Sequence, residues 1–305
     1  MRSDSQPERP AGCGATNARE NSSRTPILGG PGAIQYVPVV PGGKRKDRFH
    51  VAYSAKTGAG SPPCTNRVNN SLISVFQLTP FDRSGSDILI YGTGYGTRFL
   101  NGSPCDGAEY RARGARIDAE NVADIVRRCL ELRGTVKVDV VVPHSHADHI
   151  NPEFLHELES MNFKVQAIMT HADDLGATRN VDVAITAADP NTSRWGSLRD
   201  LIQPYGTKAS VPCLQTVCTE RIEDSPLYYL TRQGPVWMRE RGGHTPGASD
   251  LVLDIGSDTR NRIVIYGSSP PGTGPATTAN CMAPTCSTNL MGVYKTFPAH
   301  GNVRF

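Results

Sequence analysis

Several features that would assign a protein to a broad class are absent from this sequence of 305 residues. No apolar run approaches the 18 residues of a membrane-spanning helix, so no membrane span is expected. No apolar stretch of the signal-peptide type precedes the globular part, so no signal peptide is visible. The apolar fraction of 38% and the charged fraction of 20% exclude a chain that is disordered throughout.

Three common motifs are also missing. No two cysteines form a CxxC pair, which excludes a separate zinc ribbon. The glycine-rich segment at 92–96 (GTGYG) follows an expected strand but lacks the GxGxxG spacing of a dinucleotide-binding loop, so we interpret it as a turn. The segment at 267–272 (GSSPPG) does not have the GxSxG pattern of a serine-hydrolase nucleophile.

Positive charge is concentrated near the N-terminus. Residues 1–48 hold eight Lys or Arg and four Asp or Glu, a local +4 within a chain total of +3, so the remaining 257 residues carry −1. The same 48 residues are rich in Gly, Pro, Ser and Asn, and we predict a disordered basic leader followed by one catalytic domain at 49–305. Without a basic face on the globular part, a nucleic-acid partner is not expected.

Alternating patterns predict a mixed α/β fold. An N-cap at Asp118, an apolar period of 3.6 and Gly134 as C-cap predict one helix, and Asn151 followed by Pro152 predicts the start of a second that reaches Ser160. A short helix is expected at 194–202. The strands are expected at residues 71–78, 88–91, 136–142, 164–170, 226–232, 236–239, 250–255 and 262–266.

The segment between one strand and the second helix carries the strongest chemical signal. It reads His144-Ser145-His146-Ala147-Asp148-His149, with three histidines and a carboxylate in six residues. Imidazole and carboxylate groups together suit zinc and related divalent ions. The alternative is a solvent-exposed polar loop, but eight histidines in the whole chain make such a cluster improbable by chance.

Two further histidines lie in turns that could supply ligands to the same centre. His244 lies in a glycine-rich turn before an expected strand, and His300 follows an apolar run. His50, His156 and His171 are interpreted as structural, and His171, at a strand end, is also a candidate to line the cleft.

These motifs resemble those of the metallo-β-lactamase superfamily. The resemblance rests on HSHADH at 144–149, GGHTPG at 242–247, IYGSS at 265–269 and PAHG at 298–301, and covers residues 65–305. It implies a four-layer αβ/βα sandwich, in which two mixed β-sheets pack face to face with outer helices and the metals lie at one edge.

The resemblance also implies a ligand set. It assigns three protein ligands to each of two metal sites: His144, His146 and His244 to the first, and Asp148, His149 and His300 to the second. Most hydrolases of the superfamily have a bridging Asp where this chain has Ser268, and Ser268 and Ser269 are therefore candidates for substrate contact or support of the site. Because a hydroxyl is a poorer ligand than a carboxylate, we expect one or two zinc ions, the second bound more weakly.

The expected activity is that of a zinc-dependent metallohydrolase acting on a small molecule. A metal-bound hydroxide would open a small cyclic amide or ester, a β-lactam or a lactone, and Asp148 would be the catalytic residue that orients it and accepts its proton. The alternatives are a mononuclear iron oxygenase of the same fold acting on a sulfur substrate, and a degenerate, non-catalytic member. Only five residues follow His300, which counts against a glyoxalase-type thioesterase and fits a truncated chain.

The eight cysteines bear on the cellular compartment. Two pairs, 213/218 and 281/286, are each five residues apart in loops, which favours disulfides and an extracellular or periplasmic location, although free thiols in a cytosolic enzyme are the alternative. Cys129 lies on the apolar face of the first expected helix, and we predict a buried thiol. The oligomeric state is not predicted.

Overall fold

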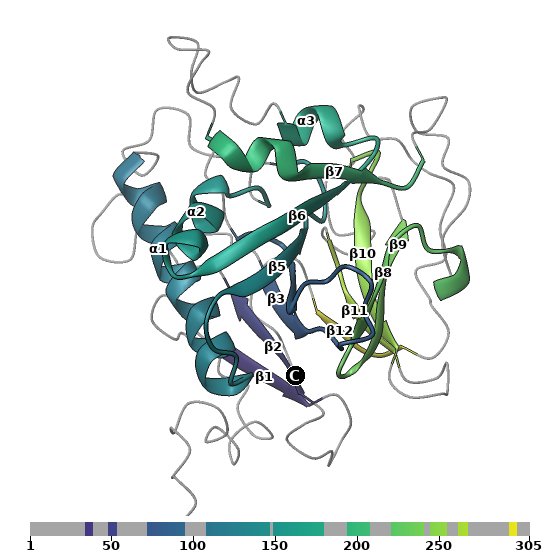
Figure 1. Ribbon diagram of the computed structural model, residues 1–305. Coiled ribbons are helices and arrows are strands. Elements are labelled where there is room, and N and C mark those ends of the chain that lie inside the picture. Colours follow the sequence, from purple (N-terminus) through teal and green to yellow (C-terminus); the bar gives the residue numbers. More distant parts are fainter. Residues whose placement is uncertain are drawn as a thin grey trace, which may run out of the picture.

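Two β-sheets form the body of the protein (Figure 1). The larger sheet has seven strands in chain order, β1-β2-β3-β4-β5-β6-β7, and the smaller has five in the order β12-β11-β10-β9-β8. Both sheets contain parallel and antiparallel pairs, as the sequence predicts. The computed structural model describes residues 34–38, 48–53, 72–94, 108–146, 149–179, 194–207, 221–240, 245–254, 262–267 and 293–297.

The strand positions confirm all eight strands predicted from the sequence. The larger sheet contains β1 (Ile34–Pro38), β2 (Arg48–Tyr53), β3 (Leu72–Gln77), β4 (Ile88–Tyr91), β5 (Val136–Val141), β6 (Phe163–His171) and β7 (Ile202–Tyr205). The smaller sheet contains β8 (Tyr228–Thr231), β9 (Gly234–Glu240), β10 (Ser249–Asp254), β11 (Arg262–Ile265) and β12 (Val293–Phe297). β1, β2, β7 and β12 are additional to the prediction.

Helices cover the outer face of the larger sheet. The pairs β4–β5 and β5–β6 are parallel, so the chain must cross over between them, and α1 (Ala108–Asp124) and α2 (Pro152–Ser160) make these crossovers. The side chains of Val122 and Phe154 are fully buried in the resulting core. Within the part of the chain that the structure describes, no helix is long and apolar enough to cross a membrane.

The start of α2 follows the predicted capping pattern. The Asn151 side chain accepts a hydrogen bond from the Phe154 amide at 3.3 Å, and Pro152 occupies the first turn, where its missing N–H costs nothing. The remaining helical segments are short: α3 (Leu175–Arg179), the 3₁₀-helices η5 (Gly196–Leu201) and η6 (Ile222–Asp224), and the π-helix η4 (Ile125–Cys129) that continues α1.

The two sheets pack face to face through an apolar layer. Phe76, Leu89 and Val141 of the larger sheet meet Met238 and Leu251 of the smaller one, and all five side chains are fully buried. Full burial of such a side chain is worth about 1.5–3 kcal/mol, so this layer fixes the two sheets relative to each other.

The outer face of the smaller sheet is buried too. Trp237, Val252 and Val264 form a third apolar cluster there, with Ile222 of η6 packed against it. Three of the four predicted layers, one of helices and two of strands, are therefore described. In the described ranges, η6 is the only helical segment on this outer face.

The first predicted helix begins ten residues too late. Asp118, predicted as its N-cap, lies inside α1, and Gly134, predicted as its C-cap, lies in the following loop at a φ of +68°. The upstream sequence is rich in Ala, Glu and Arg, which have high helix propensity without an apolar period. High helix propensity therefore explains why α1 begins upstream of Asp118, where the apolar periodicity does not predict a helix.

The predicted leader also needs correction at one segment. Ile34–Pro38 lies inside residues 1–48 but forms strand β1, which pairs antiparallel with β2 at the edge of the larger sheet. The sequence IQYVP contains β-branched and aromatic residues that suit an edge strand. Residues 1–33 and 39–47 lie outside the described residues, and the division at residue 48 stays a prediction.

The prediction of a buried thiol at Cys129 is wrong. Cys129 ends η4, is partly exposed and forms a disulfide. The other seven cysteines, its partner among them, lie outside the described residues. The bond supports the expectation that the cysteines of this chain are oxidised.

Candidate metal centre

The ends of four strands meet at one edge of the two sheets. Directly after β5, the carbonyl of Pro143 accepts a hydrogen bond from the amide of Ser249, the first residue of β10, at 3.0 Å. The Tyr91 hydroxyl, at the end of β4, donates to the Ser249 carbonyl at 2.8 Å, and the amide of Gly267, after β11, donates to the Asp250 carboxylate at 3.0 Å. The loops after β4, β5 and β11 and the loop before β10 therefore meet at this edge.

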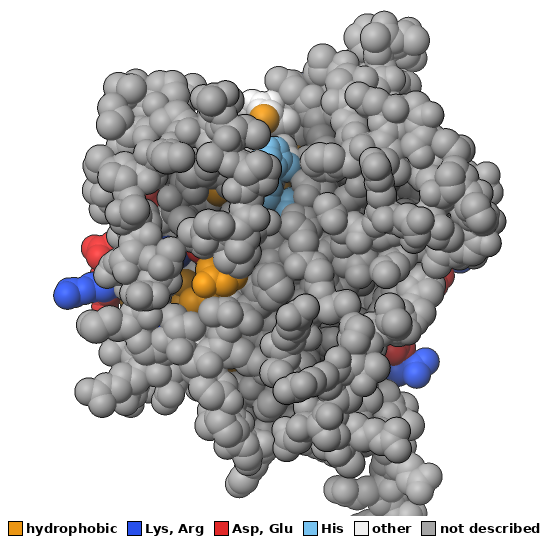
Figure 2. All heavy atoms as spheres, turned by 180° about the vertical axis from the view of Figure 1, so that it is seen from behind, with side chains coloured by type: hydrophobic (Ala, Val, Ile, Leu, Met, Phe, Trp, Pro, Cys, Tyr) orange, Lys and Arg blue, Asp and Glu red, His pale blue; other side chains and the backbone are white. Residues whose placement is uncertain are grey.

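Three predicted ligands come together in the loop between β5 and α2. The ring centroid of His144 lies 4.8 Å from that of His146 and 4.2 Å from that of His149. The His149 amide donates to the His146 carbonyl at 2.9 Å, which closes the loop on itself. His144 and His149 are buried and His146 is partly exposed. Histidine side chains also reach the surface on one face of the molecule (Figure 2).

The segment after β4 supports the histidine loop through the side chain of Thr93. The buried Thr93 hydroxyl donates to the His149 carbonyl at 2.8 Å and accepts from the Asn151 amide at 2.8 Å. Gly92 and Gly94 on either side have φ values of +80° and +77°, which glycine adopts without strain. The turn predicted at 92–96 is described only as far as Gly94, and nothing in the sequence marks Thr93 as a supporting residue.

The carboxylate of Asp174 joins two loops. Its Oδ2 atom accepts from the Ser145 amide at 3.0 Å and from the Thr245 hydroxyl at 2.6 Å, and its Oδ1 atom accepts from the Gly247 amide at 3.2 Å. Ser145 lies between His144 and His146, and Thr245 is bonded to His244 in the chain. Asp174 was not among the predicted site residues; the one signal for it is an acidic pair shortly after the expected strand.

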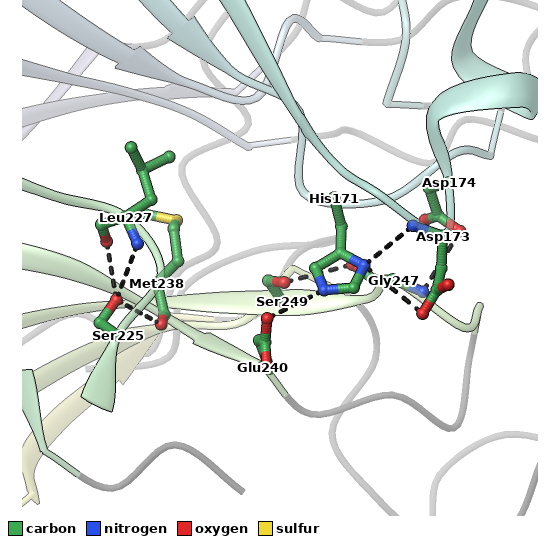
Figure 3. A network of polar contacts seen from close by, with 9 residues as sticks. All are labelled: His171, Asp173, Asp174, Ser225, Leu227, Met238, Glu240, Gly247 and Ser249. Atoms are coloured by element: carbon green, nitrogen blue, oxygen red, sulfur yellow. Dashed lines mark hydrogen bonds and ion pairs between the residues drawn. The ribbon is translucent and has the colours of Figure 1, made fainter. Parts of the chain in front are cut away.

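His171 lies behind the site rather than at its surface. It is 1% exposed, and its Nε2 atom is 2.9 Å from Glu240 Oε1 (Figure 3). The Asp173 amide lies 3.2 Å from Nδ1, and because an amide can only donate, Nδ1 accepts and Nε2 carries the proton. This burial agrees with the structural interpretation of His171, and a role in lining the cleft stays a prediction.

Tyr205 completes the surroundings of His171. The two rings meet edge to face with their centroids 5.5 Å apart. Burial raises the pKa of the Tyr205 phenol, and the carboxylates of Glu240 and Asp174 raise it further. Tyr205 therefore stays protonated and neutral beside the site.

Comparison with known proteins gives similar structures but no similar sequences. No family model matches the chain, and neither does any curated protein. Similar solved structures include BJP-1, a subclass B3 metallo-β-lactamase of Bradyrhizobium japonicum, with 10% identity, coverage of 82% of this chain and 74% of that chain, and a TM-score of 0.36. A β-lactamase from Chitinophaga pinensis has 13% identity, 74% and 62% coverage, and a TM-score of 0.32. The FEZ-1 metallo-β-lactamase from Legionella gormanii has 10% identity, 73% and 63% coverage, and a TM-score of 0.35.

These metallo-β-lactamases are what the chain is similar to. It spans 74% of the first of these proteins and less than two thirds of the other two. At such identities the likeness concerns the fold alone and carries no information on substrate or metal.

Half of the ligand set that the metallo-β-lactamase resemblance implies is described. Asp148, His244 and His300 lie outside the described residues, as do Ser268 and Ser269. Among the side chains that the structure describes, no three His, Cys, Asp or Glu are arranged as a metal-binding group on their own. His144, His146 and His149 nevertheless fit a metal centre by donor chemistry, since imidazole nitrogens are ligands that zinc prefers.

Proposed function

We propose that this chain is a metal-dependent hydrolase of small molecules. One observation carries the proposal: the loop with His144, His146 and His149 lies at the sheet edge, and Asp174 ties it to the residue that follows His244. Two segments about 100 residues apart in sequence, each with proposed ligands, thus share one anchor. A purely structural polar loop gives no reason for this convergence.

The proposed ligand set follows the two motifs. His144, His146 and His244 would hold the first zinc ion, and Asp148, His149 and His300 the second. Ser268 follows Gly267 directly, and the Gly267 amide is anchored at the same edge as the histidine loop. A serine at this place supports weaker binding of the second ion, because its neutral hydroxyl replaces a bridging carboxylate.

A bound zinc ion would supply Lewis-acid chemistry, polarising a carbonyl and lowering the pKa of water. The chain's own part is to position groups and move protons. The Asp148 carboxylate would orient the attacking water and take up its proton. The buried anchors at Thr93 and Asp174 would hold the loop still during this step.

For the substrate, we propose a β-lactam or a lactone. One support is Ser268, which stands where most hydrolases of the superfamily that the sequence resembles have a bridging Asp. The other is the disulfide at Cys129, because disulfides suit the oxidising compartments outside the cytosol. The charge of −1 over residues 49–305 supports a small-molecule substrate over a nucleic acid.

The test is a turnover assay of the zinc-loaded protein on four substrates: a β-lactam, a lactone, a thioester and a phosphodiester. We expect turnover of a cyclic amide or ester, and loss of most of it in Asp148→Ala. Asp200→Ala is the matched control, because Asp200 is exposed and belongs to η5. Metal analysis accompanies the assay. Iron at one per chain would point to an oxygenase instead, and unchanged turnover in Asp148→Ala would refute the mechanism.

A further inference from the structure

We propose that His171 and Asp174 are positioning residues that hold the turn at Thr245–Gly247, which follows His244 and is called the His244 turn below, against the loop containing His144 and His146. Both belong to the anchor segment, defined as His171–Asp174, which ends β6 and leads into α3. The proposal rests on the proposed function, since it names residues that act through the proposed metal ligands.

Asp174 holds the far end of the His244 turn. Its two carboxylate oxygens accept from Thr245 and Gly247 on one side and from Ser145 on the other. A buried carboxylate that accepts three hydrogen bonds is held in one orientation, and charged acceptors make stronger bonds than neutral ones. The position of the His244 turn is thereby coupled to that of the histidine loop.

His171 holds the chain at the end of β9, before residues 241–244. Its Nε2–H donates to Glu240, the last residue of β9 and the last described residue before the turn. The anchor segment therefore makes hydrogen bonds to the chain on both sides of residues 241–244, at Glu240 and at Thr245 and Gly247. Figure 3 shows Glu240 on one side of the His171 ring and the Asp173–Asp174 turn on the other.

Two glycines permit this close packing. A Cβ atom on Gly247 would lie 2.7 Å from His171 Cβ and 2.9 Å from Asp174 Cγ. A Cβ atom on Gly206 would lie 2.6 Å from Glu240 Oε1 and 2.7 Å from His171 Nε2. All four distances are shorter than an ordinary contact of a Cβ atom, so the backbone approaches the anchor segment where glycine is needed.

The experiment removes one anchoring bond at a time without touching a proposed ligand. Thr245→Val deletes the hydroxyl that binds Asp174, and Thr245→Ser keeps it. Thr178→Val is the matched control, because it deletes a buried threonine hydroxyl on α3 that bonds to Thr170 at 3.0 Å instead of to either loop. Asp174→Asn is the stronger perturbation.

Two quantities are measured on the full chain: affinity for Zn²⁺ alone, by competition with a chelating dye, and hydrogen exchange of the metal-free protein at the peptides containing Ser145 and Gly247. We expect Thr245→Val and Asp174→Asn to bind Zn²⁺ about 10–100-fold more weakly. We also expect exchange at both peptides to be about 5–30-fold faster. Thr245→Ser and Thr178→Val should match the wild type in both measurements.

The outcomes separate this inference from the proposed function. If the wild type binds Zn²⁺ and Thr245→Val matches it in affinity and exchange, the positioning role is wrong and the proposed function stands. If the wild type binds no Zn²⁺, the proposed function fails and the exchange data decide alone. Faster exchange at Ser145 in Thr245→Val would then still support the coupling, and unchanged exchange would overturn it.

Discussion

Replacing Thr93 with valine should destabilise the protein through the loop that carries His149. Valine has nearly the same shape but no hydroxyl, so the His149 carbonyl loses a donor and the Asn151 amide loses an acceptor. Thr93 is fully buried. Leaving a buried polar group unsatisfied costs about 1–3 kcal/mol. For two groups, we expect the free energy of unfolding to fall by about 2–6 kcal/mol.

The control for this prediction is Thr93→Ser, which keeps the hydroxyl and loses one methyl group, at a cost of about 1 kcal/mol. Urea unfolding followed by tryptophan fluorescence measures both variants. Trp195 and Trp237 are fully buried in different apolar clusters, so a single shared transition would report cooperative unfolding of both. The reasoning is refuted if Thr93→Val loses no more stability than Thr93→Ser.

Three further predictions concern the same edge and the sheet interior. Gly267→Ala should cost about 3 kcal/mol in urea unfolding, because its Cβ would overlap the Ser249 carbonyl oxygen. His146→Ala should weaken Zn²⁺ binding by more than about 100-fold in dye competition, since losing a ligand costs more than losing a supporting partner, while circular dichroism stays unchanged. Burial raises the pKa of the Asp139 carboxyl, so wild-type stability should fall as pH rises from about 4 to that raised pKa, and Asp139→Asn should lack this fall in urea midpoints.

The strands and the histidine loop could be predicted from sequence because each has a local signal. β5 is a run of β-branched residues, and α2 begins with an Asn-Pro cap. The three histidines of the loop lie within six residues. In each case the residues that predict the strand, the helix start or the loop are the same residues that form it.

The supporting residues could not be predicted because their partners are distant in sequence. Thr93 binds a carbonyl 56 residues away, and Asp174 binds a hydroxyl 71 residues away. A lone threonine in a glycine-rich turn and an acidic residue after a strand are common in surface loops. Only the folded structure brings Thr93 and Asp174 next to the loops that they bind. The strand at Ile34–Pro38 was missed for a similar reason, since it is defined by pairing with β2.

The anchors of the histidine loop act on its backbone. Thr93 binds the carbonyl of His149, Asp174 binds the amide of Ser145, and Ser249 binds the carbonyl of Pro143. These bonds fix the course of the chain without using an imidazole ring. The loop should therefore hold its shape before an ion binds, unlike a zinc finger, which folds only with its metal. The binding energy of the metal would then go into affinity instead of into ordering the loop, which is the advantage of a site built on the ends of packed strands.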